Sequence, residues 1–442
     1  MEDKQNQIIT AIVLSSFILA LAYSFYFKID SAVDAAAYDK IAWNLVQGNG
    51  YKESADLPFD KDIAILRVGP GYEFFLAGIY YVFGHYIWIV WIIHALLSAA
   101  STYLAFLLSK EIFKKSWSFF IGAATASFMA FSPDLITMSG MLMTETLGVF
   151  LIALSAYLFF KHINGSASRL FSIILTAFIF GLTILTRTTA ALMVLPVFYY
   201  YFSKKNWKEL AVFIFVLAAV FTPWTVRNYK TYGVFIPTTN VLGYDLLVGN
   251  HSGATGELEP YAPAENYLSE KGSILGSQLA LKDALIFIVS RPLEFLKIIF
   301  YRIFIYFSFA RPTGFWFHLE GASRALTLAL SALYSILLFV LGFLGIYKIK
   351  ELLPEDKERA KFLFWMLLMM PLSVVWIIVE TRYRFLAYPF FAVFSGYSLA
   401  SLFNKKNSFK PILMIFGILF LNSVFDVWRN SERIIERIME LL

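Results

Sequence analysis

Long apolar stretches, separated by short polar segments, run along almost the whole chain. The first covers about residues 8–27, and further runs lie near 86–108, 117–133, 143–161, 170–186, 189–203, 209–225, 324–347, 361–379, 384–402 and 410–427. About 20 consecutive apolar residues in a helix cross the hydrocarbon core of a bilayer. The pattern therefore predicts an all-α integral membrane protein with about eleven transmembrane helices. The first run ends in bulky aromatic residues and precedes many others, which predicts an uncleaved helix rather than a signal peptide.

Basic residues are concentrated in alternate loops between the apolar runs. These loops cover about residues 110–115, 161–169, 204–208, 348–361 and 405–410. An excess of Lys and Arg marks cytoplasmic loops, so the remaining loops, including the two long ones at 28–85 and 226–322, are expected to face outward. Charged apolar segments in both long loops, and the segment 428–442, predict helices that lie in the membrane interface. We expect residues 1–442 to form a single membrane-embedded domain.

Composition agrees with this picture and excludes several classes of protein. Hydrophobic residues make up 59% of the chain and charged residues 15%, which is too few charges for a soluble surface. A soluble enzyme, a disordered protein, a fibre and a secreted module are therefore excluded. The net charge of +6 lies in short loops that set orientation, so no nucleic-acid partner is expected. The absence of cysteine excludes disulfides and thiol chemistry.

Two carboxylates are candidates for chemistry. Asp34 lies in the first outward loop, four residues before Tyr38, and this spacing places both on one face of a helix. A carboxylate held at a membrane surface can serve as a general base on a hydroxyl or an amine. Glu145 lies near the outward start of a span, where an acid is a functional candidate by default. The alternative is a structural role, in which Glu145 forms an ion pair with one of the arginines. Most other acids of the first loop are expected to be solvated.

Several arginines lie at the expected outward ends of apolar runs, where positive charge is statistically disfavoured. Guanidinium groups match the oxygens of phosphate, so a shared lipid-phosphate site is one interpretation, and separate interfacial anchors are the other. The five histidines show no spacing typical of metal ligands. The sequence assigns no cofactor, and a divalent metal ion stays a candidate for which no motif is found. The arginines in question are Arg67, Arg187, Arg227, Arg382 and Arg384.

These elements, in this order, resemble the membrane glycosyltransferases that use polyprenyl-phosphate sugars. That superfamily includes the lipid A aminoarabinose transferases, their galacturonosyltransferase relatives and the protein O-mannosyltransferases. The resemblance rests on Asp34, Tyr38, Ala42, Asn44-Leu45, Gly48 and Gly50, then Arg67, Pro70-Gly71-Tyr72 and Phe83-Gly84, and later Thr144-Glu145, Leu185-Thr186-Arg187, Pro223-Trp224, Arg227-Asn228-Tyr229, Gly249-Asn250, Arg382-Tyr383-Arg384 and Pro389. Ala35 stands where several relatives carry an acid, which argues against a direct transfer of the protein-mannosylating activity.

The resemblance implies the type C membrane glycosyltransferase fold, with an active site that faces away from the cytoplasm. It implies an inverting enzyme of the plasma or inner membrane that moves one sugar from a polyprenyl-phosphate donor to a lipid, glycan or protein acceptor. Asp34 would then be the base, and Tyr38 and Glu145 would bind the acceptor or the sugar. The five arginines would bind the lipid phosphate. Membrane lipids surround such a protein.

Two alternative functions stay open at this point. One is a transporter or flippase for a lipid-linked glycan, in which the same arginines would bind phosphate during passage. The other is a ligase or polymerase that transfers a whole glycan from a lipid pyrophosphate. We find no internal sequence repeat of the kind seen in inverted-repeat transporters. The candidate charges also lie at the ends of spans rather than in their middles, which favours the single-sugar transferase over the transporter.

Overall fold

The computed structural model describes residues 2–114, 117–165, 168–310, 318–403 and 409–431, and all regular secondary structure in these segments is helical. The α-helices are α1 (Glu2–Phe27), α2 (Asp34–Val46), α3 (Gly71–Phe83), α4 (Ile87–Ile112), α5 (Ser118–Ala130), α6 (Pro133–Ser139), α7 (Thr144–Ile163), α8 (Arg169–Thr186), α9 (Val194–Ser203), α10 (Trp207–Tyr232), α11 (Leu242–Gly249), α12 (Ala262–Ser290), α13 (Pro292–Phe307), α14 (Gly321–Tyr347), α15 (Pro354–Val374), α16 (Tyr388–Leu402) and α17 (Lys410–Arg429). Short 3₁₀ helices are η1 (Ala64–Leu66), η2 (Thr188–Met193), η3 (Lys348–Glu351) and η4 (Thr381–Ala387). The predicted all-α membrane class is confirmed.

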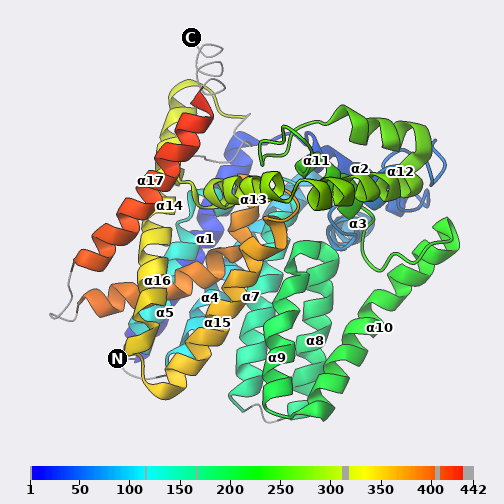
Figure 1. Ribbon diagram of the computed structural model, residues 1–442. Helices are drawn as coiled ribbons and strands as arrows, with labels where there is room; N and C mark the ends of the chain where they lie inside the picture. Colours follow the sequence, from blue (N-terminus) through cyan, green and yellow to red (C-terminus); the bar gives the residue numbers. More distant parts are fainter. Residues whose placement is uncertain (1, 115–116, 166–167, 311–317, 404–408, 432–442) are drawn as a thin grey trace.

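The number of spans agrees roughly with the expected eleven. Among the described residues, nine helices are long and apolar enough to cross a membrane, and a tenth is formed if α5 and α6, bent by 54°, are one span. α12 meets these criteria, yet Figure 1 shows it lying across the end of the bundle together with α13. α9 and α15 run along the bundle, as the sequence predicts, although neither meets the length and composition test.

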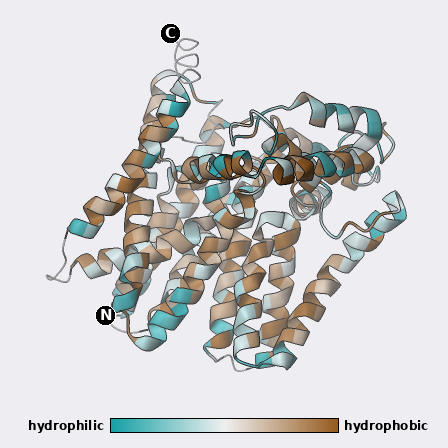
Figure 2. Cartoon of the chain, in the orientation of Figure 1, coloured by the Kyte–Doolittle hydropathy of each residue, from teal (hydrophilic) through white to brown (hydrophobic). Residues whose placement is uncertain are grey.

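The helices of the two long loops gather at one end of the bundle. α2 and α3 from the first loop and α11, α12 and α13 from the second lie at the end opposite the N-terminus (Figure 1). We call this the loop end. Apolar residues dominate the bundle helices and polar residues collect at the two ends (Figure 2), which is the arrangement that a bilayer requires. The expected helix at 428–442 falls mostly on residues 432–442, which lie outside the described residues.

Backbone hydrogen bonds connect the two long loops. The Ile65 carbonyl accepts from the backbone N–H of Asn240 (3.0 Å), and the Asp60 carbonyl accepts from that of Ser273 (2.9 Å). Between the two halves of α12, Gly272 has φ +80°, and a Cβ atom there would lie 2.4 Å from the Asp60 oxygen. Only glycine fits this close approach without strain. The loops therefore form one cover over the loop end.

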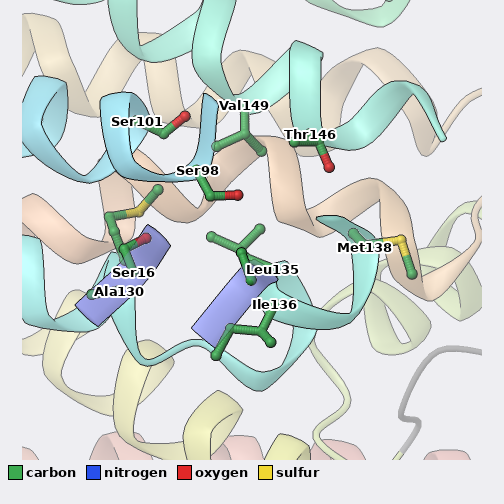
Figure 3. Close-up of a pocket in the computed structure, with 11 residues that line it drawn as sticks. Ser16, Ser98, Ser101, Ala130, Leu135, Ile136, Met138, Thr146 and Val149 are labelled. Atoms are coloured by element: carbon green, nitrogen blue, oxygen red, sulfur yellow. The ribbon is translucent and has the colours of Figure 1, made fainter. Parts of the chain in front are cut away.

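The bundle interior contains a small cavity that offers no chemistry. It has a volume of about 20 Å³ and lies among α1, α4, α5, α6 and α7 (Figure 3). Its walls are apolar side chains and the hydroxyls of Ser16, Ser98, Ser101 and Thr146. That volume is enough for about one water molecule. No charged side chain lines it, so the candidate chemistry lies elsewhere.

Candidate active site

Asp34 lies at the start of α2 and is held by two arginines. Its Oδ1 accepts a hydrogen bond from Arg67 Nη1 (3.2 Å), and its Oδ2 accepts one from Arg382 Nη2 (2.7 Å). The side chain is 22% exposed, so it lies at the boundary between interior and surface. Each carboxylate oxygen thus has its own guanidinium partner, which fixes the orientation of the carboxylate. Charge-assisted pairs of this kind are among the strongest hydrogen bonds in proteins.

The Arg-Val-Gly-Pro-Gly segment brings Arg67 close to the end of α8. A Cβ on Gly69 would lie 2.2 Å from the Leu185 carbonyl oxygen, and one on Gly71 would lie 2.5 Å from Thr186 Oγ1. Both glycines are therefore needed for backbone contact with the last residues of α8. Arg187 follows directly after α8, so this packing brings it into the neighbourhood of Arg67.

Glu145 lies close to two arginines, and one of them, Arg382, also binds Asp34. It lies in the first turn of α7, is fully buried, and has its Oε1 3.5 Å from Arg187 Nη1 and 3.8 Å from Arg382 Nε. The Thr144 hydroxyl accepts from Arg187 Nη1 (2.8 Å). The Tyr383 ring centre lies 5.2 Å from the guanidinium carbon of Arg187 and 5.7 Å from that of Arg382. Asp34, Glu145 and three of the five candidate arginines therefore form one network.

Two further acids belong to this network. Glu53 accepts a hydrogen bond from Arg67 Nη2 (2.6 Å), and Glu380 accepts one from Arg382 Nε. The sequence predicted that Glu53 is one of the solvated loop acids, and this was wrong because Arg67 turns back onto its own loop. Four carboxylates thus face three guanidinium groups.

Arginine charge keeps Asp34 ionised. Burial alone would raise the pKa of the Asp34 carboxyl, but Arg382, Arg67 and Arg187 together outweigh burial and hold this pKa below its usual value of 3.8. Asp34 is therefore a carboxylate throughout the neutral pH range.

A cavity of about 430 Å³ adjoins this network. Arg187, Tyr383 and Asp245 give it a polar side, and Thr188 and Thr189 add hydroxyl groups. The other walls are mainly apolar, contributed by Val68, Ala191, Leu192, Val241, Leu242, Leu372, Val374, Trp376, Ile377 and Ile378. An apolar cavity with a few convergent polar groups is typical of a ligand site. The apolar walls suit an apolar part of a ligand, and the Arg187 guanidinium suits an anionic head.

Sequence reasoning missed Asp245. It lies in α11, lines the cavity, and is the only acid between Arg227 and Glu257 in the chain. Burial, together with the nearby Asp34 and Glu380 carboxylates, raises its pKa from 3.8 to about 7. An isolated acid in an apolar stretch was the available signal.

Arg227 lies outside the network. Its guanidinium carbon lies between 5.0 and 5.7 Å from the ring centres of Phe59, Trp224, Tyr232 and Tyr51. The side chain also donates to the Asn228 side-chain oxygen (3.0 Å). It is thus held by cation–π contacts in an aromatic cluster that joins α10 to the first loop.

Arg384 also points away from Asp34. On the 3₁₀ helix η4, residues two apart face in different directions, so Arg382 and Arg384 diverge. Arg384 is fully buried and donates to the Ser308 carbonyl (2.6 Å) and to Ser335 Oγ (3.1 Å). Nearby, the buried Asp134 accepts from Tyr388 Oη (2.7 Å). The expected Arg382/Arg384 pair is therefore split between two sites.

Two other residues of α2 face the interior of the protein. Tyr38 shares a face with Asp34, as expected, but it is 1% exposed and packs edge-on against Tyr72. Asp39, which the sequence placed in the solvated loop, accepts hydrogen bonds from Tyr80 Oη (2.5 Å) and pairs with His85 (2.9 Å). The solvated interpretation of Asp39 was wrong, because α3 packs along α2 and brings both partners to it.

Metal binding has no ligand set in the described residues. No group of three or more His, Asp or Glu side chains is placed to hold an ion there. The acids around Asp34 each pair with a guanidinium group through at least one carboxylate oxygen. The proposed chemistry therefore assigns no step to a metal ion.

Comparisons with known proteins find similarity to membrane glycosyltransferases. Residues 67–226 match the family model described as dolichyl-phosphate-mannose-protein mannosyltransferase. No curated protein matches the sequence of the chain. The predicted resemblance to the polyprenyl-phosphate-sugar glycosyltransferases is confirmed by this match and by the solved structures that follow.

Three solved structures share the fold. ArnT from Cupriavidus metallidurans bound to undecaprenyl phosphate has a TM-score of 0.52 and 12% identity, over 92% of this chain and 61% of that one. The Archaeoglobus fulgidus oligosaccharyltransferase in the apo form has a TM-score of 0.56 and 15% identity, over 97% and 56%. The archaeal oligosaccharyltransferase AglB from Archaeoglobus fulgidus, in complex with an inhibitory peptide and a dolichol-phosphate, has a TM-score of 0.52 and 13% identity. The match covers 97% of this chain and 55% of that one.

These matches establish the type C membrane glycosyltransferase fold that the sequence predicts. The chain spans between 55% and 61% of the length of these three solved proteins. The shared part includes the membrane bundle and the loop end, because over nine-tenths of this chain is matched in each case.

Proposed function

We propose that this protein transfers a single sugar from a polyprenyl-phosphate carrier to an acceptor at the loop end, with inversion at the anomeric carbon. The observation that carries the proposal is the position of Asp34: a carboxylate held between Arg67 and Arg382, beside a largely apolar cavity that Arg187 also lines. The fold is shared with enzymes of this class, and the ArnT structure with this fold has undecaprenyl phosphate bound.

Asp34 would act as the base. Its carboxylate takes the proton from an acceptor O–H or N–H as that atom forms a bond to the anomeric carbon. The bond between the anomeric carbon and the phosphate oxygen breaks, and its electron pair leaves on the phosphate. A donor phosphate that accepted a hydrogen bond from Arg382 would weaken the ion pair between that arginine and Asp34. The pKa of Asp34 would then rise, which would make the carboxylate a stronger base.

The arginines would stabilise the departing phosphate. Arg187 lines the cavity, and its Nε is buried without a hydrogen-bond partner within the described segments. A buried donor without a partner is costly, and a phosphate oxygen would satisfy it. Fixed cationic donors aimed at developing charge are usually the largest contribution to catalysis in such sites. A phosphate leaving group has a low pKa, so no general acid is required.

The orientation of the site is part of the proposal. The loop end lies opposite the N-terminus and opposite the ends at which the Lys-rich loops were predicted (Figure 1). Positive residues favour the cytoplasmic side, so the loop end would face the periplasm or the cell exterior. The acceptor would approach Asp34 from that side, where the carboxylate is partly exposed.

The test is transfer from a radiolabelled donor. The purified full chain, in vesicles, is given undecaprenyl-phosphate sugars with membrane extract, and label is followed into lipid, glycan and protein fractions. The proposal expects label in one of these fractions with release of undecaprenyl phosphate. Movement of intact labelled lipid across the vesicle membrane, without any covalent transfer, would instead favour a flippase and contradict the proposal.

A further inference from the structure

Asp245 is an acid that the proposed mechanism does not use. It is half-buried, lines the cavity of about 430 Å³, and shares that lining with Arg187 and Tyr383. Its carboxylate makes no hydrogen bond and no ion pair with any residue in the described segments. Asp245 is therefore a binding-site candidate, because it lies in the wall of a ligand-sized cavity and no cationic side chain pairs with it in the described segments.

The backbone around Asp245 is held firmly in place. A Cβ on Gly243 would lie 2.0 Å from the Ser277 carbonyl oxygen, so α11 touches α12 directly. Ser277 Oγ donates to the Asn240 carbonyl (2.5 Å), one residue before the turn that starts α11. Asn240 in turn is bonded to Ile65 of the first loop. The carboxylate is therefore presented to the cavity by a fixed helix rather than by a free loop.

Charge decides which part of a donor suits Asp245. The phosphate would belong with the arginines, because a second anion beside Asp245 would be repelled. Asp34 and Glu380 are close enough to help raise the pKa of Asp245 to about 7. The group bound here must therefore lie near the base, offer hydrogen-bond donors, and carry no negative charge. The ring hydroxyls of the donor sugar meet all three conditions.

We propose that Asp245 recognises the donor sugar by accepting hydrogen bonds from its ring hydroxyls, and that it makes the site select sugars without a carboxylate over uronic acids. This inference rests on the proposed function. Asp245 would determine which sugar binds and would not be a catalytic residue, because it takes no part in the bonds that form and break during transfer.

Binding of three kinds of probe tests the inference. The purified full chain is titrated at pH 8, where most of Asp245 is ionised, with undecaprenyl phosphate, with its glucose, mannose and galactose derivatives, and with the glucuronic acid derivative. A hydrogen bond to a charged group corresponds to about 1.5–3 kcal/mol, which is roughly a 10- to 150-fold change in affinity. Asp245→Ala should weaken the best-bound neutral donor by such a factor. The same change should leave undecaprenyl phosphate binding equal or stronger, because it removes a negative charge.

A second variant keeps the test valid if Asp245→Ala folds poorly. Asp245→Asn has the same shape and should raise the affinity for the glucuronic acid derivative relative to the neutral donor. Asp30→Ala, on an exposed acid outside the cavity, is the matched control and should change none of these affinities. Equal changes for undecaprenyl phosphate and for the sugar-bearing donors would overturn the role of Asp245, as would a wild type that binds no sugar derivative better than undecaprenyl phosphate. A wild type that does not bind undecaprenyl phosphate at all would instead overturn the proposed function.

Discussion

Replacement of Arg187 by alanine separates the donor site from the rest of the network. Arg187 is 2% exposed, donates to the Thr144 hydroxyl (2.8 Å), and lies 3.5 Å from Glu145. Its buried Nε has no partner in the described residues and is available to a phosphate oxygen. We expect Arg187→Ala to weaken binding of undecaprenyl phosphate. Each hydrogen bond to a charged group corresponds to about 1.5–3 kcal/mol, or roughly 10- to 150-fold in Kd.

The same substitution also affects stability, and this effect has to be separated from binding. Removal of one partner of a buried ion pair costs about 3–5 kcal/mol, because the other charge stays behind unpaired. Arg382, 3.8 Å from Glu145, compensates for part of that cost. Arg187→Ala combined with Glu145→Gln removes the leftover charge. The double variant should recover most of the lost thermal stability while its affinity for undecaprenyl phosphate stays low.

The assay is a titration of the detergent-purified chain with undecaprenyl phosphate, accompanied by thermal unfolding of each variant. Arg227→Ala is the matched control, since the sequence gives both arginines the same role. Arg227 lies in its aromatic cluster instead, so its removal should lower the unfolding temperature modestly and leave Kd unchanged. An equal loss of affinity in the Arg227 and Arg187 variants would refute the assignment of the donor site.

Three further substitutions probe stability and the separation of the two arginine sites. Folding raises the pKa of Asp245 from 3.8 to about 7, so its ionisation destabilises the folded state increasingly as the pH rises between these two values. Asp245→Asn removes this cost and should raise the unfolding temperature more at pH 8 than at pH 5. An equal gain at pH 5 and pH 8 would contradict this prediction. Gly71→Ala should destabilise the fold by about 1–3 kcal/mol and so lower the unfolding temperature, because the added methyl group would overlap Thr186. Gly78→Ala, which has open space around it, should leave the unfolding temperature unchanged. Similar unfolding temperatures for both variants would refute the close contact. Arg384→Leu should destabilise the fold, by about 1.5–3 kcal/mol for each of the two hydrogen bonds that the guanidinium donates, and should leave Kd for undecaprenyl phosphate unchanged in the folded fraction, as titration would show.

Part of the site could be predicted because its signals are local. The spacing of Asp34 and Tyr38 predicted a shared helix face, and the structure has it. The fold class followed from the apolar runs, because the lengths of membrane helices are set by the bilayer.

The remaining contacts depend on tertiary packing. Arg382 reaches Asp34 across 348 positions of sequence, and only the path of the chain brings them together. Arg187 and Arg227 look alike in the sequence, since each follows an apolar run. Their surroundings differ. Arg187 lies between α7 and η4, whereas α10 packs chiefly on α8 and places Arg227 in the aromatic cluster. Arg384 diverges from Arg382 because residues two apart on a helix lie on different faces, and only the packing of η4 shows which neighbours each arginine meets.

The most direct test of the central claim is the rate of sugar transfer by Asp34→Asn, measured beside its binding of undecaprenyl phosphate. The substitution keeps the shape of the side chain and removes the base. We expect transfer to fall by about 10²–10⁴-fold. Binding should be equal or tighter, because a negative charge leaves the space between Arg67 and Arg382. Asp30→Asn should retain wild-type transfer. Wild-type transfer by Asp34→Asn would contradict the assignment of Asp34 as the catalytic base.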